Sequence, residues 1–171
     1  LRVTVFKDDI NQLARLSQLS LKTNQFNLTT HRYTETDIAR FIESANHTVF
    51  SFDVADKFGD YGITGLCILV TDTKSGTATI DTLLMSCRII GRNIERAFMN
   101  YLVANLEKKG ISTLSARYVE TPKNAQVEDF YPACSFQQDS RQGKEHTYLL
   151  HLADYTPSDT HYIEVIDEPG N

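Results

Sequence analysis

Residues 81–99, DTLLMSCRIIGRNIERAFM, read as an apolar strand, a polar turn that contains Gly91, and a long amphipathic helix. Backbone N–H groups at the start of a helix point away from it, and the helix dipole adds partial positive charge there. The turn at Gly91 is therefore predicted to bind a phosphate or pyrophosphate group. Chemistry is expected where the strand ends, around Ser86, Cys87 and Arg88.

Cys87 is the candidate nucleophile of this segment. Positive charge from Arg88 and from the helix start would favour its thiolate, which could accept an acyl group as a thioester and pass it on to another thiol. The alternative is a small buried residue, as free cysteines often are. Tyr131 is the candidate general acid, since a phenol suits the protonation of a departing thiolate. Its alternative role is that of a core aromatic residue.

Three amides, Asn24, Gln25 and Asn27, occur together in a segment rich in Asn, Gln and Thr. Amides can hold the hydroxyl groups of a substrate without adding charge, so we predict that these residues bind substrate. Asp60 is a further candidate, either as a base or as a hydroxyl anchor. The alternatives are loop hydrogen bonds for the amides and ordinary turn chemistry for Asp60.

Arg88 and Arg92 are the candidate phosphate ligands, because guanidinium groups pair with phosphate oxygens through two hydrogen bonds. Arg92 near a helix start is unfavourable for the dipole, which indicates another reason for its presence. Asn93 tolerates a left-handed backbone, so it could complete the turn after Gly91. The alternative for the arginines is a surface ion pair.

No metal site is predicted, because no two of the five histidines have the spacing of a zinc motif. The cysteines number three and are far apart, which fits neither a disulfide framework nor a zinc cluster. A reducing, cytoplasmic location is therefore expected.

The composition limits the classes of partner. A net charge of −5 and a pI near 5.5 argue against general binding of nucleic acid. No apolar run approaches the ~20 residues of a membrane-spanning helix, and no signal peptide is visible. The chain of 171 residues begins at Leu1, so we expect a domain of a longer protein. It is predicted to form one domain over 1–153, followed by an acidic tail over 154–171 that could add an edge strand over 161–166.

The spacing of apolar and turn residues predicts the elements that hold these side chains. Strands are expected over 1–6, 48–54, 63–71, 77–86, 111–119, 134–138 and 147–152. Helices are expected over 8–21, from Thr34 or Thr36 to Glu43, over 92–109 and over 124–131. Residues 22–33 read as a loop, and turns are expected over 58–62 and 72–76. This order predicts an α+β fold, with a mixed, mostly antiparallel sheet flanked by helices on both faces.

That order, with a phosphate-type turn after the fourth long strand, resembles the fold of GNAT acyltransferases. Residues 124–136, NAQVEDFYPACSF, resemble the family's pattern of Asn, Tyr seven positions later and Gly-Phe after three more, with Ser135 in place of the glycine. The resemblance implies that Asn124 contacts a pantetheine arm and that Tyr131 protonates the thiolate of coenzyme A. The phosphate turn matches the pattern Gln/Arg-x-x-Gly-x-Gly/Ala incompletely in either register, and one register places Glu95 at a small-residue position.

Four further stretches resemble a narrower group, the C-terminal domain of FkbH-like proteins: KTNQFNLTT, FGD, MSCR and TPKN. In that family a HAD-type phosphatase domain precedes this one, and the proteins make glyceryl-S-acyl carrier protein for polyketide extender units. The resemblance implies that this domain acts on the pantetheine thioester of an acyl carrier protein or of coenzyme A.

Three functions follow as hypotheses. The first is transfer of a glyceryl-type acyl group, with Cys87 as the relay nucleophile. The second is a non-catalytic module that docks the acyl carrier protein through a basic patch, formed by Arg88, Arg92, Arg96 and Lys123. The third is a coenzyme-A-dependent N-acetyltransferase.

Overall fold

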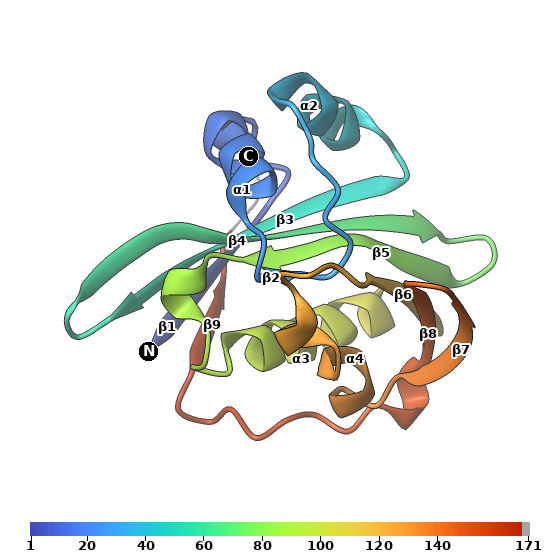
Figure 1. The fold of residues 1–171 in the computed structure, drawn as a ribbon. Helices are drawn as coiled ribbons and strands as arrows, with labels where there is room; N and C mark the ends of the chain where they lie inside the picture. The colour runs from blue at the N-terminus through green and yellow to red at the C-terminus, as the bar shows by residue number, and fades with distance from the viewer. Residues whose placement is uncertain (169–171) are drawn as a thin grey trace.

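A computed structural model describes residues 1–168 as a twisted sheet with helices on both faces (Figure 1). The strands are β1 (Arg2–Lys7), β2 (Phe26–Asn27), β3 (His47–Asp56), β4 (Gly59–Asp72), β5 (Thr77–Met85), β6 (Thr113–Val119), β7 (Gln137–Gln142), β8 (Glu145–His151) and β9 (Glu164–Asp167). The α-helices are α1 (Leu13–Lys22), α2 (Glu35–Glu43), α3 (Ile94–Lys108) and α4 (Phe130–Ala133). Short 3-10 helices are η1 (Ile10–Gln12), η2 (Cys87–Ile89), η3 (Ala125–Val127) and η4 (Leu152–Asp154).

The strand order across the sheet is β7-β8-β6-β5-β4-β3-β1-β9, and β2 pairs with β5 outside this path. Only β5–β6 and β1–β9 are parallel pairs among these strands. Helices α1 and α2 lie on one face of the sheet, and α3 and α4 lie on the other (Figure 1). The α+β fold class and the mixed, mostly antiparallel sheet are thus confirmed.

Local signals explain where the first two helices begin. The Asp9 carboxylate accepts a hydrogen bond from the N–H of Asn11 and so caps η1, which leads into α1. Thr34 and Asp37 form a reciprocal capping box at the start of α2, as their spacing predicts. Helix α2 therefore starts after Thr34 and not after Thr36.

Two apolar cores hold the sheet between its helices. On the α3 face, the rings of Phe52 and Phe98 stack with centroids 5.0 Å apart. Gly65 is required beneath them, because a Cβ atom there would lie 1.9 Å from the Phe52 ring. On the α1 and α2 face, a smaller core forms around Leu66 and Ile38.

The parallel strands β5 and β6 separate after a short pairing. Their register runs only from Thr77–Ile80 against Thr113–Ala116. Beyond it, β2 fills the gap: Phe26 pairs with Met85, and the Val119 N–H donates to the Leu28 carbonyl over 2.8 Å. The segment predicted as a loop over 22–33 therefore contains a short strand that periodicity could not detect.

The remaining differences concern the ends of elements and the helix predicted over 124–131, which the structure divides into η3 and α4. Strand β4 already begins at Gly59, so the hairpin after β3 turns earlier than the predicted 58–62. The edge strand expected in the tail is β9, which runs parallel to β1; the last three residues of that tail lie outside the described part. No helix within residues 1–168 is both long and apolar enough to cross a membrane.

Candidate functional site

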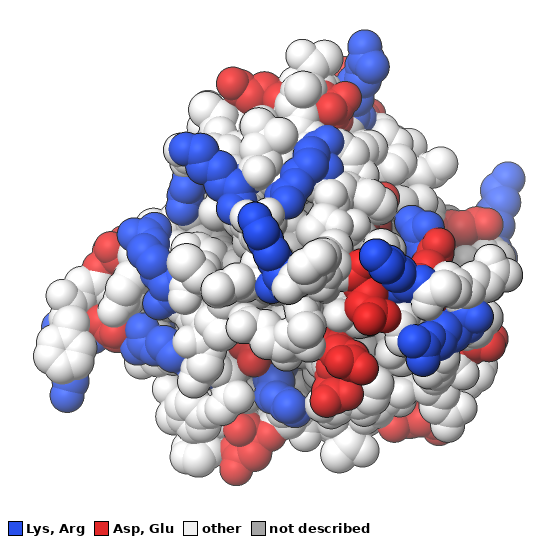
Figure 2. All heavy atoms as spheres, in the orientation of Figure 1, with Lys and Arg blue, Asp and Glu red and all other residues white. Residues whose placement is uncertain are grey.

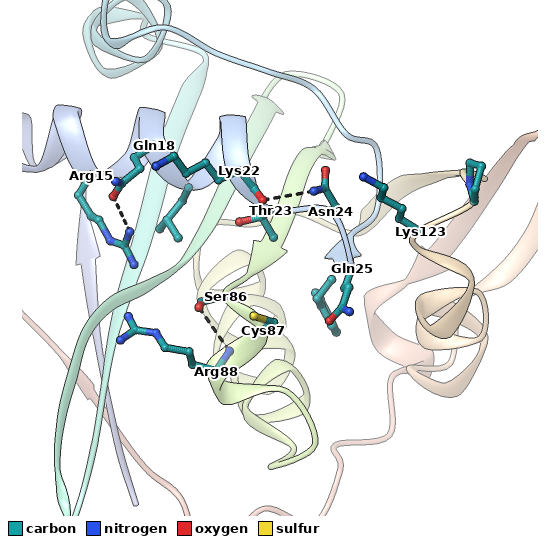
Figure 3. Close-up of a pocket in the computed structure, with 13 residues that line it drawn as sticks. Arg15, Gln18, Lys22, Thr23, Asn24, Gln25, Ser86, Cys87, Arg88 and Lys123 are labelled. Atoms are coloured by element: carbon teal, nitrogen blue, oxygen red, sulfur yellow. Dashed lines mark hydrogen bonds between the residues drawn. The ribbon is translucent and has the colours of Figure 1, made fainter.

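A cavity of about 760 Å³ opens between α1, the segment that leads into β2, and the residues that follow β5 (Figure 3). Its lining is Arg15, Gln18, Leu19, Lys22, Thr23, Asn24, Gln25, Phe26, Ser86, Cys87, Arg88, Pro122 and Lys123. We call it the basic cavity. Its volume falls within the range of small-molecule sites.

Cys87 is exposed and lies in the middle of the basic cavity, between Ser86 and Arg88 (Figure 3). It is the first residue of η2, where the Ser86 hydroxyl accepts a hydrogen bond from the Arg88 N–H over 3.4 Å. The alternative of a buried cysteine is therefore excluded. Helix η2 separates Cys87 from the start of α3 at Ile94, whose dipole was expected to act on this thiol.

Among residues 1–168, the lining of the basic cavity includes four cationic side chains and no carboxylate; the cations are Arg15, Lys22, Arg88 and Lys123. Burial and the charge of Arg88 lower the pKa of Arg15 below its usual range. The two guanidinium groups thus repel each other without full compensation. Figure 2 shows several Lys and Arg side chains on the displayed face, with Asp and Glu side chains among them.

Asn24 and Gln25 line the basic cavity, as the amide hypothesis requires. The Asn24 Oδ1 accepts a hydrogen bond from Arg32 over 2.6 Å, which fixes its orientation. Asn27 does not reach the cavity, because it is fully buried. Its amide donates to the Thr23 carbonyl and accepts from the Thr30 N–H, so it supports the fold instead.

A second, smaller cavity of about 380 Å³ lies at the start of α3 and is lined by Phe26, Ile90, Gly91, Glu95, Arg96, Gln126, Val127, Asp129, Phe130 and Ala133. It contains two carboxylates, Glu95 and Asp129, beside one guanidinium. Burial raises the pKa of Glu95, whose Oε2 is buried without a hydrogen-bond partner among the described residues. Because of its two carboxylates, the second cavity is less suited to a phosphate group than the basic cavity is.

The predicted phosphate turn has the expected backbone but different side-chain contacts. Gly91 and Asn93 both adopt positive φ, 87° and 63°, so Asn93 replaces glycine in the left-handed region. The Asn93 amide, however, donates to the Tyr162 hydroxyl over 2.7 Å. Arg92 forms an ion pair with Asp56 over 2.7 Å and faces the Tyr61 ring. The surface ion pair considered as the alternative is therefore what Arg92 forms.

Three other candidates lie outside both cavities. Tyr131 is 1% exposed, and its hydroxyl is buried without a hydrogen-bond partner among the described residues; burial also raises its pKa well above the usual value. Asn124 is fully buried and donates to the carbonyls of Asn27 and Val119. The Asp60 carboxylate accepts from the Gly62 N–H, which is the turn role. The structure does not bring Tyr131 and Cys87 to a common surface.

The motif that contains Tyr131 nevertheless has the backbone that the family pattern requires. Ser135 occupies the position of the usual glycine and adopts a φ of 74°, in the left-handed region. Cys134 before it and Phe136 after it are buried. The serine thus takes a glycine-like conformation, and the motif shapes the end of α4 without opening a cavity.

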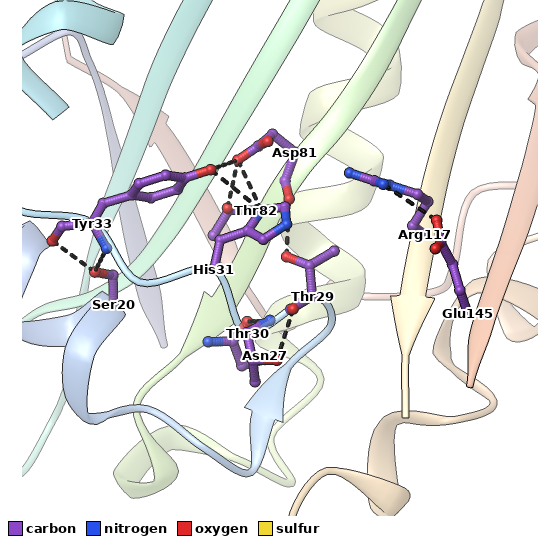
Figure 4. Close-up of polar contacts among 10 residues, drawn as sticks. All are labelled: Ser20, Asn27, Thr29, Thr30, His31, Tyr33, Asp81, Thr82, Arg117 and Glu145. Atoms are coloured by element: carbon purple, nitrogen blue, oxygen red, sulfur yellow. Dashed lines mark hydrogen bonds and ion pairs between the residues drawn. The ribbon is translucent and has the colours of Figure 1, made fainter. Parts of the chain in front are cut away.

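A polar cluster that sequence reasoning missed lies where β5 and β6 separate (Figure 4). The Asp81 carboxylate accepts hydrogen bonds from the hydroxyls of Tyr33 and Thr82 over 2.7 and 2.8 Å, and His31 lies 3.4 Å away. Burial raises the pKa of Asp81, but these hydrogen bonds outweigh it and hold the pKa below its usual range. No sequence signal connects residues this far apart. Residues 1–168 contain no cluster of His, Cys, Asp and Glu that could hold a metal ion.

Neither a family model nor a curated protein matches this chain. Solved structures do. The ribosomal-protein-S18-alanine N-acetyltransferase from Escherichia coli is 15% identical, with a TM-score of 0.66 over 92% of this chain and 97% of that one. PaiA N-acetyltransferase from Thermoplasma acidophilum, solved in complex with coenzyme A, is 13% identical, with a TM-score of 0.70 over 88% and 99%. A protein from Desulfovibrio desulfuricans described as a GNAT-family acetyltransferase is 14% identical, with a TM-score of 0.64 over 88% and 99%.

The chain therefore has the fold of GNAT acetyltransferases. Identities of 13–15% establish the fold but not the reaction, which depends on the residues of the site.

Proposed function

We propose that this protein transfers an acyl group from a thioester, with Cys87 as the thiol that accepts the group. The observation that carries the proposal is the exposed Cys87 thiol at the centre of the basic cavity, in a fold shared with acyltransferases. The cations around the thiol would stabilise the oxyanion that forms when a thiolate attacks a carbonyl.

The proposed step is a thioester exchange. The Cys87 thiolate attacks the carbonyl carbon of the donor thioester, a new C–S bond forms, and the donor's C–S bond breaks to release its thiol. Attack by a second thiol then returns Cys87 to its free form. The proton lost from one thiol is taken up by the other, so the exchange balances without an oxidant or reductant.

The donor in this proposal is the phosphopantetheine thioester of an acyl carrier protein or of coenzyme A, and the acyl group is of glyceryl type. The resemblance to FkbH-like proteins supports both assignments. Asn24 and Gln25, which lie beside Cys87, supply amides suited to the hydroxyls of such a group.

A coenzyme-A-dependent N-acetyltransferase is the second candidate, favoured by structural neighbours that are N-acetyltransferases. The basic cavity opposes it, because a protonated amine acceptor would meet four cations there. Tyr131 is also too deeply buried to protonate a departing thiolate without a rearrangement. Tight binding of acetyl-coenzyme A, measured by calorimetry, with acetylation of an amine by the Cys87→Ala variant, would favour this candidate.

A docking module without catalysis is the third candidate. Its predicted basic patch is not a single surface: Arg88 and Lys123 line the basic cavity, Arg96 lines the second cavity, and Arg92 pairs with Asp56. A carrier could still bind at the mouth of the basic cavity.

Intact-protein mass spectrometry tests the proposal. The protein is mixed with a glyceryl or similar small acyl thioester of a carrier protein, and the acyl mass is expected on Cys87 and to be absent from the Cys87→Ala variant. Cys134→Ala is the matched control, because that thiol is buried. Transfer that proceeds equally well in Cys87→Ala would contradict the proposal and support the docking module.

A further inference from the structure

Arg15 and Arg88 are anchored side by side on one strand, although 73 positions separate them in the chain. Arg15, from α1, donates through Nε to the Ile63 carbonyl over 2.9 Å. Arg88, from η2, donates through Nη2 to the Tyr61 carbonyl over 3.2 Å. Both carbonyls belong to β4. The strand thus holds two guanidinium groups in fixed positions at one end of the basic cavity (Figure 3).

No acidic side chain within residues 1–168 neutralises either guanidinium. Within residues 1–168, the ion pairs involve other arginines, and neither Arg15 nor Arg88 forms one. Arg15 makes one further hydrogen bond, to the neutral Oε1 of Gln18 over 2.7 Å. Two adjacent cations without a counter-charge cost electrostatic energy, and an anion placed between them would offset it.

The other end of the cavity differs in chemistry. Lys123 and the amides of Asn24 and Gln25 lie across from the arginines, with Cys87 between the two ends (Figure 3). A ligand that spans the cavity would therefore place an anionic group at Arg15 and Arg88 and its neutral, polar part toward the amides.

We infer that the basic cavity binds an anionic small molecule through Arg15 and Arg88, and that the acyl group handled at Cys87 carries a carboxylate or phosphate at its far end. The link to the acyl group rests on the proposed function, whereas anion binding at the two arginines does not. A volume of about 760 Å³ suits a small molecule, and the net charge of −5 disfavours a nucleic acid as the occupant.

Titrations followed by NMR chemical shifts test the inference with matched probes: succinate against neutral succinamide, and inorganic phosphate. Succinate and phosphate are expected to bind saturably and succinamide at least tenfold more weakly. Arg88→Gln should weaken anion binding by tenfold or more, since a charge-assisted hydrogen bond contributes about 1.5–3 kcal/mol. Arg15→Gln should act in the same direction. Arg117→Gln, which changes an arginine outside the cavity paired with Glu145, is the control and should change nothing.

The titration itself separates this inference from the proposed function. Succinate carries no thioester, so its binding at the two arginines is expected even if no acyl transfer occurs at all. Equal binding of succinate and succinamide, or binding that survives both Arg15→Gln and Arg88→Gln in folded protein, would overturn the inference.

Comparing 4′-phosphopantetheine with pantetheine identifies the source of the charge. If 4′-phosphopantetheine binds through Arg88 while succinate does not bind, the arginines recognise the donor arm. The assignment to the acyl group would then be wrong.

Discussion

Phe26 packs edge to face on Phe130, with ring centroids 5.5 Å apart, and it lines both cavities. Its strand, β2, pairs with β5 at Met85, two residues before Cys87. Strand β2 thus fills the gap between β5 and β6. A pantetheine arm, which carries amides, cannot pair with that edge of β5 while β2 occupies it.

Replacing Phe26 with Ala should therefore lower the free energy of unfolding and join the two cavities. A loss of about 3–5 kcal/mol is expected for a buried Phe, measured by urea denaturation. Phe58→Ala is the matched control, because Phe58 is 82% exposed, and its effect should stay within about 0.5 kcal/mol. Equal free energies of unfolding for the two variants would show that Phe26 does not pack between the two cavities as described.

Asn124 is expected to stabilise the fold and not to bind a ligand. It connects three segments through its amide, donating to the Asn27 and Val119 carbonyls and accepting from the Thr121 N–H. Asn124→Ala should lower the free energy of unfolding by about 2 kcal/mol or more, since buried groups lose their partners. Gln25→Ala, an exposed amide in the basic cavity, should leave stability unchanged. If Asn124→Ala reduced only ligand affinity, the family role that the resemblance implies would be restored.

Asp53, which lies against Asp60, should make stability fall with rising pH between about pH 4 and pH 6. Burial, a hydrogen bond with Asp60 and its charge raise the pKa of Asp53 to about 6, above the ~3.9 of an unfolded chain. The folded state then binds more protons than the unfolded state between about pH 4 and pH 6, so this group's contribution decreases as the pH rises through that window. Asp53→Asn should flatten the profile and raise the melting temperature at pH 7. Asp139→Asn, at an exposed position of β7, should do neither.

The sequence offers Thr34 and Thr36 as starts of α2, with capping-box spacing between Thr34 and Asp37, and the structure has Thr34 as the cap. Thr34→Ala should cost about 1 kcal/mol, because the Thr34 hydroxyl accepts from the Asp37 N–H. Thr36→Ala lies inside the helix and is exposed, so urea denaturation should show little change. The reverse order of the two effects would contradict the capping box.

Much of the fold could be predicted from local signals, because strands, caps and turns are encoded within a few residues. The site was only partly predictable. Cys87 and Arg88 follow a strand with a readable end, and Asn24 and Gln25 stand out as amides. Arg15 was not predictable, because a polar residue on a helix normally faces water; its contact with Ile63 spans 48 positions.

The burial of Tyr131 and Asn124 could not be predicted either. Both residues match a family pattern in type and spacing, and spacing alone does not reveal burial. The unpredicted strand β2 covers this region. The Asn124 amide donates to the Asn27 carbonyl, and the Phe130 ring packs on the Phe26 ring. The motif therefore forms part of the core, and the accessible thiol of Cys87 lies in the basic cavity, on the other side of Phe26.

Intact-protein mass spectrometry with succinyl- and butyryl-pantetheine thioesters tests the central claim most directly. Both donors have four-carbon acyl groups, and only the succinyl group carries a free carboxylate. The account predicts an acyl adduct on Cys87 that forms at least tenfold faster from succinyl-pantetheine, with that preference lost in Arg88→Gln. The absence of any adduct on Cys87 with these and with glyceryl donors would contradict acyl transfer at this thiol. Equal rates for the two donors would contradict the anionic acyl group alone.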